Sequence, residues 1–439
     1  MTANALYQTG HIERLGDKKG MKKLLMMVAL AAMPALAAEK TVSGDVTYTN
    51  ASEFNSTTEY YIKAGASDKT VTFGRLYLTK YLQVYYSGTT QMPITFEATD
   101  ESYGIGTLTG DFVIGGGNGS CHLTINNGTD STGSGKLLVG WHSGSDSART
   151  GYLALKGGSM AIGAETRLGG YGNGSTGTMV IDGGTFSCGN LKLGYGRSDK
   201  GYLYVSNGVV SVNGALFVGN GNDSTGYVEI CEGGTLNAYS ASFTIPAASG
   251  ATGSIMMKGG TLDTRSRNIT LGNGSSPGYF CISNGTANVN AFLLGGSSGN
   301  ADTLEVSGGS LNVGDTRLGT VSGVTGNLVI NGGEMTVSDG NYVQLGHVSG
   351  ATGNLELNGG VLKVYEPLAS SGKGTIAFNG GILAPMDTSA MTFNLANITS
   401  TIADGGMMVS NDYTVTIKMT GFSAGDGVVS PKITKKGSG

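Results

Sequence analysis

The side chains best suited to bind a ligand are rings that follow a glycine in three consecutive segments of similar sequence. These residues are Trp141, Tyr171 and Tyr195, with His142 next to Trp141, the only tryptophan of the chain. Flat rings repeated in steps along one edge of a protein could stack on successive sugar rings. Tyrosine is also frequent on exposed strands that bind nothing. The pattern therefore indicates a candidate glycan-binding edge, with ordinary exposed strand residues as the alternative.

A second set of tyrosines recurs at the start of several segments, at positions expected to face outward. This set consists of Tyr152, Tyr202, Tyr227 and Tyr279. The same two interpretations apply to it, because tyrosine suits an exposed strand as well as a binding surface.

Two aspartates could form a catalytic pair. Asp199 and Asp223 each lie fifteen residues after the glycine turn of their own segment, and the two segments are neighbours. If the segments stack, the carboxylates would lie about 5 Å apart, which is the separation in a retaining glycosidase or in part of a calcium site. No third carboxylate or column of Arg or Lys accompanies them, so solvated loop carboxylates are the simpler interpretation. We expect no catalytic residues, no metal site and no cofactor.

The four cysteines do not have the spacing of a metal site. The repeat register places Cys121 and Cys188 on inward positions, Cys281 on an outward position and Cys231 in a bulge. They belong to alternate segments, which places them about 9–10 Å apart, beyond the ~7 Å Cα separation of a disulfide. We therefore expect four free thiols.

A repeat of about 25 residues carries all of these side chains. Residues 176–196, TGTMVIDGGTFSCGNLKLGYG, consist of three runs in which apolar and polar residues alternate, separated by glycine turns. Alternation with a period of two is typical of strands with one buried face. The second residue of the first turn recurs at Gly128, Gly158, Gly184, Gly208, Gly234, Gly260, Gly285, Gly309, Gly333, Gly360 and Gly381. Such a period indicates a solenoid.

Each copy supplies about six apolar side chains to the interior. In the 176–196 unit they are Met179, Ile181, Phe186, Cys188, Leu191 and Leu193. We therefore predict an all-β chain that forms a single parallel β-helix over residues 116–383, with about eleven coils of ~25 residues and three short strands per coil. Residues 39–115 would form an N-terminal cap and irregular early coils, and the period fails after Gly381.

Composition and charge agree with a turn-rich β protein. The chain has 77 Gly, 7 Pro and 13% charged residues, and its net charge is −4. Scattered Lys and Arg leave no electrostatic footprint for nucleic acid or an anionic membrane. Residues 21–38 have the basic start, apolar centre and A-x-A site of a secretory signal, too short for a membrane span. Residues 1–20 would then be an upstream extension that is not native to the exported protein.

The C-terminal segment, residues 384–439, carries a second pattern. Its key residues are Gly405-Gly406, Asn411, Val415, Ile417 and the run ITKKGSG at 433–439. This pattern resembles the autotransporter-associated β-strand repeat of bacterial passenger domains, and the TG-x-L-x-I-x-GG copies at 121–383 are similar to passenger coils. The resemblance implies a right-handed parallel β-helix that is exported and displayed by a C-terminal outer-membrane barrel. The chain contains no barrel pattern, so it would be a fragment whose barrel lies downstream.

The expected function is that of an exported, non-enzymatic passenger on the outer-membrane surface, acting as a stalk or adhesin-like scaffold. Surface glycans or extracellular matrix would be its partners, and nucleic acid would not. A carbohydrate-active β-helix enzyme that uses Asp199 and Asp223 is the alternative. A purely mechanical spacer is the third possibility.

Overall fold

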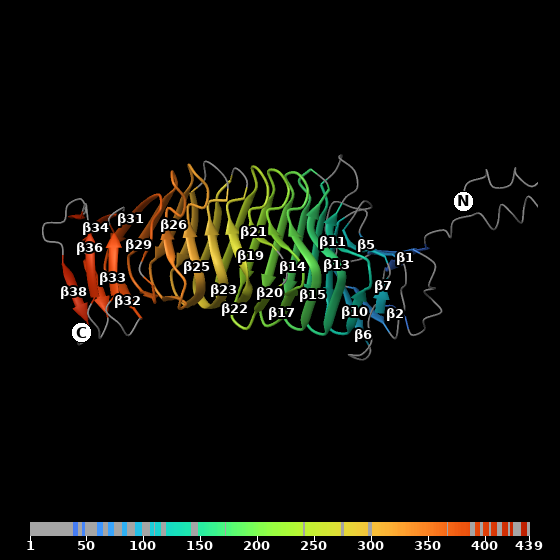
Figure 1. Cartoon of the computed structure of the whole chain (residues 1–439). Coiled ribbons are helices and arrows are strands. Elements are labelled where there is room, and N and C mark those ends of the chain that lie inside the picture. Colours follow the sequence, from blue (N-terminus) through green and yellow to red (C-terminus); the bar gives the residue numbers. More distant parts are fainter. Residues whose placement is uncertain are drawn as a thin grey trace, which may run out of the picture.

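Parallel strands stack in steps along one axis in the computed structural model of the chain, from the N-terminal strands at one end to the C-terminal strands at the other (Figure 1). Up to residue 120 the structure describes residues 38–42, 46–48, 59–64, 69–73, 81–85, 93–98, 106–108, 110–115 and 120. From residue 121 to 436 it describes all residues except 142–147, 172, 240–241, 274–275, 297–300, 367, 387–390, 396–397, 404, 411–414, 420–421 and 425–431. Across these ranges, none of the chain forms a helix with the length and apolar character needed to cross a bilayer.

Each coil contributes up to three strands, and each strand pairs in parallel with its counterparts in the coils before and after it. β14 (Thr176–Ile181), for example, pairs residue for residue with β12 (Thr150–Leu155) and β16 (Lys200–Val205). The strands therefore form three columns along the axis, and the regular part contains about 11 coils. The predicted parallel β-solenoid is confirmed.

The first column begins each coil. Besides β12, β14 and β16 it contains β2 (Val46–Tyr48), β4 (Lys69–Phe73), β6 (Pro93–Ala98), β9 (Cys121–Ile125), β19 (Thr225–Ile230), the first parts of β22 (Thr252–Leu271) and β23 (Gly278–Leu294), β24 (Ala301–Val306), β26 (Thr325–Ile330), β29 (Thr352–Leu357), β31 (Lys373–Phe378), β34 (Ile398–Ile402) and β37 (Phe422–Ala424).

The second column follows the glycine turn. It contains β7 (Gly106–Leu108), β10 (Thr129–Thr132), the first parts of β13 (Ser159–Gly170), β15 (Thr185–Leu193) and β25 (Ser310–Leu318), β17 (Val209–Val212), β20 (Thr235–Ala238), the middles of β22 and β23, β27 (Glu334–Val337), β30 (Val361–Val364), β32 (Ile382–Pro385), β35 (Met407–Ser410) and β38 (Ile433–Lys436).

The third column closes each coil. It contains β1 (Ala38–Val42), β3 (Glu59–Ala64), β5 (Tyr81–Tyr85), β8 (Phe112–Ile114), β11 (Leu137–Trp141), β18 (Leu216–Val218), β21 (Phe243–Ile245), β28 (Val343–Leu345) and the last parts of β13, β15, β22, β23 and β25. Two further strands, β33 (Met391–Leu395) and β36 (Val415–Met419), pair with each other.

The predicted three strand segments per coil are separate strands in some coils and are joined into longer strands in others. β22 and β23 run without a break through both corners, and β13, β15 and β25 join their second and third strands. The register of the pairing shifts at the corners, between Lys258 and Thr261 and between Thr264 and Asn268 in β22, so the segments stay distinct.

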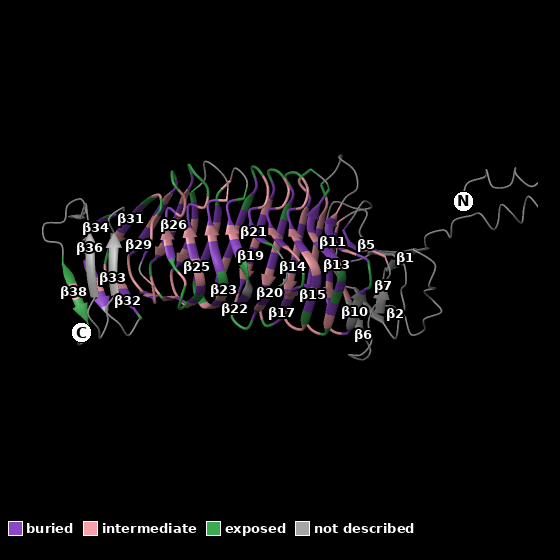
Figure 2. Ribbon diagram, in the orientation of Figure 1, coloured by how far each residue is buried: buried purple, intermediate pink, exposed green. Residues whose placement is uncertain are grey.

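Buried residues recur along the strands of successive coils (Figure 2). Their side chains form one continuous hydrophobic core. The six inward residues predicted for the 176–196 unit are all buried, with at most 1% of their surface exposed. Phe280 and Phe292 of β23 pack edge to face, with ring centroids 5.1 Å apart. Period-two alternation therefore identified the core of this fold correctly.

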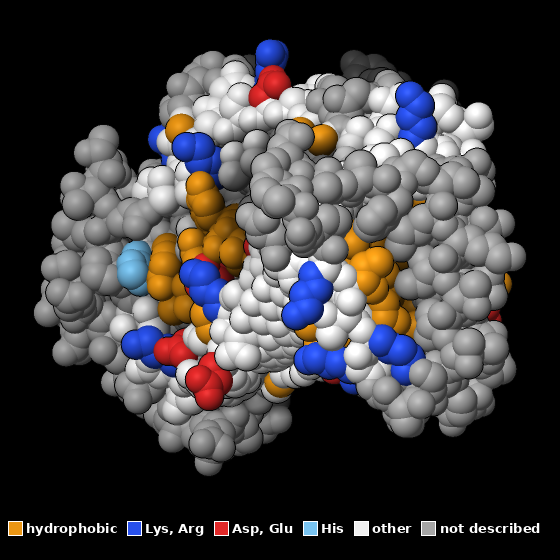
Figure 3. All heavy atoms as spheres, turned by 90° about the vertical axis from the view of Figure 1, so that its left-hand side faces the viewer, with side chains coloured by type: hydrophobic (Ala, Val, Ile, Leu, Met, Phe, Trp, Pro, Cys, Tyr) orange, Lys and Arg blue, Asp and Glu red, His pale blue; other side chains and the backbone are white. Residues whose placement is uncertain are grey.

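The expectation that the period fails after Gly381 is wrong. β34 pairs with β31 and β35 pairs with β32, so the first and second columns continue into the C-terminal segment. Gly406 has a φ of 76° and supplies the next corner. Ser400 takes an inward, fully buried position in β34, and this polar residue masks the apolar alternation. The view onto the C-terminal end shows hydrophobic side chains between charged ones (Figure 3).

Candidate functional site

The predicted aromatic residues meet beyond the third strands of neighbouring coils, but not in a single column. Trp141, at the end of β11, aligns with Gly170, and the N–H of Tyr195 donates to Gly169 in the same coil as Gly170. Tyr171 lies one residue further on, in the left-handed region with a φ of 63°, and is 57% exposed. Its ring centroid is 5.5 Å from that of Tyr195.

Gly170 lies between the side chains of Trp141 and Tyr195. A Cβ atom at this position would lie 3.2 Å from Cδ1 of Trp141 and 3.8 Å from Cβ of Tyr195. The two side chains therefore cover the glycine from the coils on either side. His142 lies outside the residues that the structure describes.

Two cations lie over the Tyr195 ring, and the sequence interpretation missed both. The guanidinium carbon of Arg167 is 3.9 Å from the ring centroid and Nζ of Lys192 is 5.0 Å from it. Arg167 is also 5.8 Å from the centroid of Tyr171. Such cation–π contacts are worth about 0.5–2 kcal/mol each. Both residues are outward residues of adjacent third strands, so the alternation could have located them. We call Trp141, Arg167, Tyr171, Lys192 and Tyr195 the aromatic edge.

A buried carboxylate orients these cations. Glu165 is 8% exposed; it contacts Arg167, and its carboxylate lies 2.9 Å from Nζ of Lys192 and 3.5 Å from Nζ of Lys136. Burial opposes ionisation of Glu165, but the hydrogen bond from Lys192 and the charge of Arg167 outweigh it and lower the pKa of this carboxyl. Three cations around one carboxylate leave the aromatic edge with a positive local charge.

The two aspartates do not form the predicted pair. Asp199 is fully buried, and its carboxylate accepts the N–H groups of Ser175 at 2.8 Å and Gly196 at 2.9 Å. β16 and β19 pair with Lys200 opposite Thr225. Asp199 and Ser224 directly precede these two residues, so Ser224 is the neighbour of Asp199 in the next coil.

Asp223 has a different environment. It lies in the turn with a φ of 55°, its side chain is 54% exposed, and its carboxylate lies 3.5 Å from Nε of Arg197. The predicted stacking is therefore wrong by one residue, because the turn length between glycine and loop does not fix which residue faces inward.

The burial and hydrogen bonds of Asp199 indicate that its carboxylate has a structural role. Burial raises its pKa to about 6, although the N–H groups of Ser175 and Gly196 counteract part of that increase. A carboxylate with both oxygens bonded to backbone and no exposed surface cannot reach a substrate without a rearrangement of the corner.

Two of the second set of tyrosines, Tyr227 and Tyr279, donate hydrogen bonds to carboxylates on the outward face of the first column, and Tyr152 and Tyr202 contact the rings of His122 and Tyr227. The hydroxyl of Tyr227 donates to Glu229 at 2.5 Å, and Nζ of Lys258 bonds the same carboxylate at 2.9 Å. The Tyr279 hydroxyl donates to Glu305 at 2.6 Å. Burial and the nearby carboxylate raise the pKa of both tyrosines. These rings are therefore held by their neighbours in the sheet.

All four cysteines are free thiols. Cys121 and Cys188 are buried on inward positions, as the register predicts. Cys281 is on an outward position but only 3% exposed. Cys231 follows β19 in a turn with one extra residue, so the predicted bulge lies in the turn and not within the strand. Burial raises the pKa of each thiol, to about 12 at Cys188.

Within the described part of the chain, no three His, Cys, Asp or Glu side chains gather in a way that could hold a metal ion. Comparisons with known proteins add no assignment. No family model matches the chain, and no curated protein and no solved structure matches it.

Proposed function

We propose that this chain is an exported, surface-displayed passenger of the autotransporter type that acts as a stalk and binds glycans through the aromatic edge. The observation that carries the binding proposal is the packing of Arg167 and Lys192 on Tyr195 beside the exposed ring of Tyr171. The exposed ring of Tyr171 next to oriented cations suits a sugar residue that carries a carboxylate. Acidic glycans of a cell surface or extracellular matrix are therefore the proposed partners.

The stalk role is supported by the regularity of the coils. Their inward residues form one core cluster, and parallel ladders join every coil to the next. About 11 coils at a spacing of roughly 4.8 Å extend the regular part by about 50 Å. A rod of this kind holds a binding edge away from the surface that displays it.

A non-enzymatic role is supported by how the two aspartates are used. Asp199 bonds the backbone of a corner, and Asp223 pairs with Arg197. The carbohydrate-active enzyme that uses both aspartates is the alternative, and its test is direct. Release of reducing ends from a polysaccharide by the wild type, abolished in Asp199→Asn/Asp223→Asn, would overturn the stalk proposal.

Replacement of Tyr171 with asparagine should weaken binding of polygalacturonate about tenfold. One stacked ring contributes about 0.5–1.5 kcal/mol, and the upper end of this range corresponds to about tenfold in affinity. Asparagine tolerates the positive φ of this residue, so the loop keeps its shape. Calorimetric titration measures the change, and binding of the wild type should weaken as salt is raised.

The matched control is Tyr239→Ala, because Tyr239 is also an exposed tyrosine, 44% accessible, and lies outside the aromatic edge. The affinity of the Tyr239→Ala variant for polygalacturonate should equal that of the wild type. Equal affinities of the Tyr171→Asn variant and the wild type, or no binding by the wild type, would exclude the aromatic edge as the binding site.

Processing of the N-terminus tests the export proposal. Cleavage after the A-x-A site at Ala35–Ala37 leaves Ala38 as the first residue of the mature protein, where β1 begins. Intact-mass measurement of the protein from a Gram-negative host should give a chain that starts at Ala38. A change of Ala35 and Ala37 to leucine should abolish cleavage. A cell-associated chain that keeps residues 21–37 in the wild type would contradict export by this signal.

A further inference from the structure

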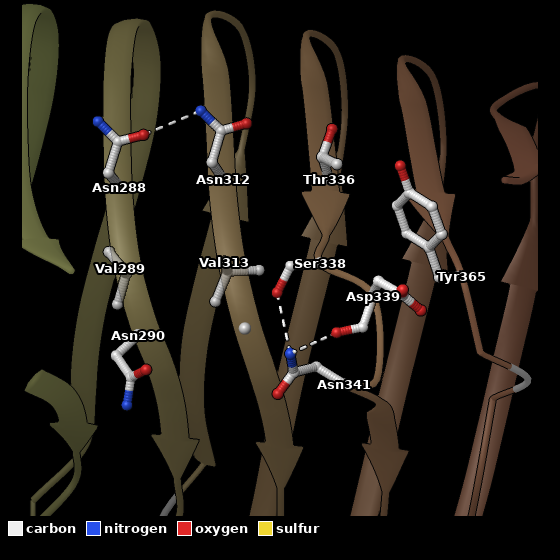
Figure 4. Close-up of a pocket in the computed structure, with 11 residues that line it drawn as sticks. Asn288, Val289, Asn290, Asn312, Val313, Thr336, Ser338, Asp339, Asn341 and Tyr365 are labelled. Atoms are coloured by element: carbon white, nitrogen blue, oxygen red, sulfur yellow. Dashed lines mark hydrogen bonds between the residues drawn. The ribbon is translucent and has the colours of Figure 1, made fainter. Parts of the chain in front are cut away.

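Two adjoining hollows lie at the corner between the second and third columns, a different corner from the aromatic edge. One has a volume of about 570 Å³ and is lined by residues of β23, β25, β27 and the segments after β27 and β30. The other has a volume of about 640 Å³ and is lined by residues around β21, β22 and β23. Asn290 lines both, so the hollows meet. We call the first hollow the asparagine groove (Figure 4).

The outer wall of the asparagine groove is a row of polar side chains, one from each coil. Asn288, Asn312 and Thr336 are in register across β23, β25 and β27. In the next coil Lys363 is in register with Thr336, and Tyr365, two residues further on, lines the groove (Figure 4). Nδ2 of Asn312 donates to Oδ1 of Asn288 at 3.0 Å. That bond leaves the amide nitrogen of Asn288 and the amide oxygen of Asn312 for a ligand.

The opposite wall carries two more amides. Nδ2 of Asn290 donates to Asn268 at 2.8 Å, and Nδ2 of Asn341 donates to Oγ of Ser338 at 2.9 Å and to the carbonyl of Asp339 at 3.1 Å. These bonds fix the two side chains and leave both amide oxygens as acceptors. Gly314 lies in the coil between those of Asn290 and Asn341. A Cβ atom at Gly314 would lie 3.5 Å from Oδ1 of Asn341.

The groove carries little charge. Asp339 is the one charged residue of its lining, and the neighbouring Lys363 and Glu334 neutralise each other at 2.6 Å. Amides that are already oriented offer both donors and acceptors, which is what the hydroxyl groups of an uncharged sugar require. The aromatic edge, with its two cations Arg167 and Lys192, is positively charged by contrast.

The spacing of these groups matches an extended saccharide. Each coil advances the row by roughly 4.8 Å, which is close to the length of one sugar residue in an extended chain. Four coils, from Asn288 to Tyr365, would thus place one set of polar contacts per sugar. The ring of Tyr365 can cover the apolar face of the sugar at that end.

We propose that the asparagine groove binds a neutral, linear glycan whose chain lies along the axis of the solenoid, with one sugar residue per coil and Tyr365 against the last of them. This site is separate from the aromatic edge and goes beyond the function proposed above.

The test uses calorimetric titration of the whole chain with three neutral probes: cellohexaose, mannohexaose and xylohexaose. At least one should bind, and its shorter oligomers should gain affinity up to four sugars, the number of coils in the groove. Asn312→Ala removes an amide that bonds Asn288 and faces the groove, so affinity should fall about tenfold. Tyr365→Ala should cause a loss of similar size through the lost stacking.

Asn358→Ala is the matched control. Asn358 is half-buried and also donates Nδ2 to an asparagine of the preceding coil, Asn331 at 2.9 Å, but it follows a first-column strand and does not line the groove. The Asn358→Ala variant should bind the neutral hexasaccharide with the same affinity as the wild type. Tyr171→Asn should also leave binding of the neutral probe unchanged. The proposal for the aromatic edge and the proposal for the groove can therefore be rejected independently of each other.

Three results would each overturn the groove proposal. They are no binding of any of the three neutral hexasaccharides, equal affinities in the wild type, Asn312→Ala and Tyr365→Ala, and binding of hexagalacturonate alone. Unchanged circular dichroism and unchanged melting temperature of both groove variants establish that a loss of affinity is local.

Discussion

Replacing Phe280 with alanine should lower the free energy of unfolding by about 3–5 kcal/mol. Phe280 is fully buried in β23, among the largest side chains of the core, and its ring packs against Phe292. Its neighbours in the adjacent coils, Ile255 and Leu304, are held by parallel ladders on both sides and cannot collapse into the space. The loss therefore includes a cavity as well as the missing burial.

Urea unfolding followed by circular dichroism measures this change. Phe217→Ala is the matched control, because Phe217 is on the outward position of β18, between inward Leu216 and Val218. The Phe217→Ala substitution should lower the free energy of unfolding by less than about 1 kcal/mol, as most surface substitutions do. Equal losses for the two variants would mean that the alternation does not divide the chain into an inside and an outside.

That division is the part of the fold that the sequence predicts best. A strand has a period of two, so the positions of Met179 and Ile181, or Phe186 and Cys188, identify the inward face without any knowledge of the neighbours. The repeated glycine turn then aligns one coil with the next. The C-terminal coil was missed because its inward residues include Ser400, and the pattern contains no information on a buried serine.

The candidate sites depend on which side chains of neighbouring coils align, and the repeat pattern does not predict this. Gly170 aligns with Trp141, and this moves Tyr171 one residue outside the column. A shift of one residue in a corner has no effect on the alternation of the flanking strands, yet it decides which side chains meet. A separate shift of one residue, between Val212 and Leu216, separates Asp199 from Asp223. The asparagine groove is built from residues of four coils. Asn288, Asn312 and Thr336 occupy the same position of successive coils, but the repeat does not fix the type of residue there.

Asp302 departs from the repeat inside the core. It aligns with Gly326 of the next coil, at a position where a side chain points inward, and it is fully buried. Its carboxylate accepts the N–H of Gly278 at 2.7 Å and of Gly295 at 2.6 Å. Burial raises the pKa of Asp302 to about 6, and the two N–H groups counteract part of that rise. Asp199 has the same combination of full burial, two backbone donors and a pKa of about 6.

These two aspartates should make the solenoid lose stability as the pH rises from 4 to 7.5. In the unfolded chain an aspartate has a pKa of about 3.9, so folding favours the protonated form of a group whose folded pKa is about 6. The stabilising contribution is complete below about pH 4 and is lost as the pH rises through about 6. A difference of about two pKa units corresponds to about 3 kcal/mol for each aspartate at most.

The variant Asp199→Ser/Asp302→Gly isolates this contribution. Both replacements use residues of neighbouring coils, Ser224 and Gly326, at the same positions, so the corners keep their backbone. Glu165 and Glu305 have lowered pKa values and act with the opposite sign, but they are common to both proteins and cancel in the comparison. The wild type should therefore lose several kcal/mol relative to the variant between pH 4 and 7.5 in urea unfolding. Parallel pH profiles would mean that both carboxylates are already ionised in the folded chain at pH 4, with their backbone N–H groups outweighing burial.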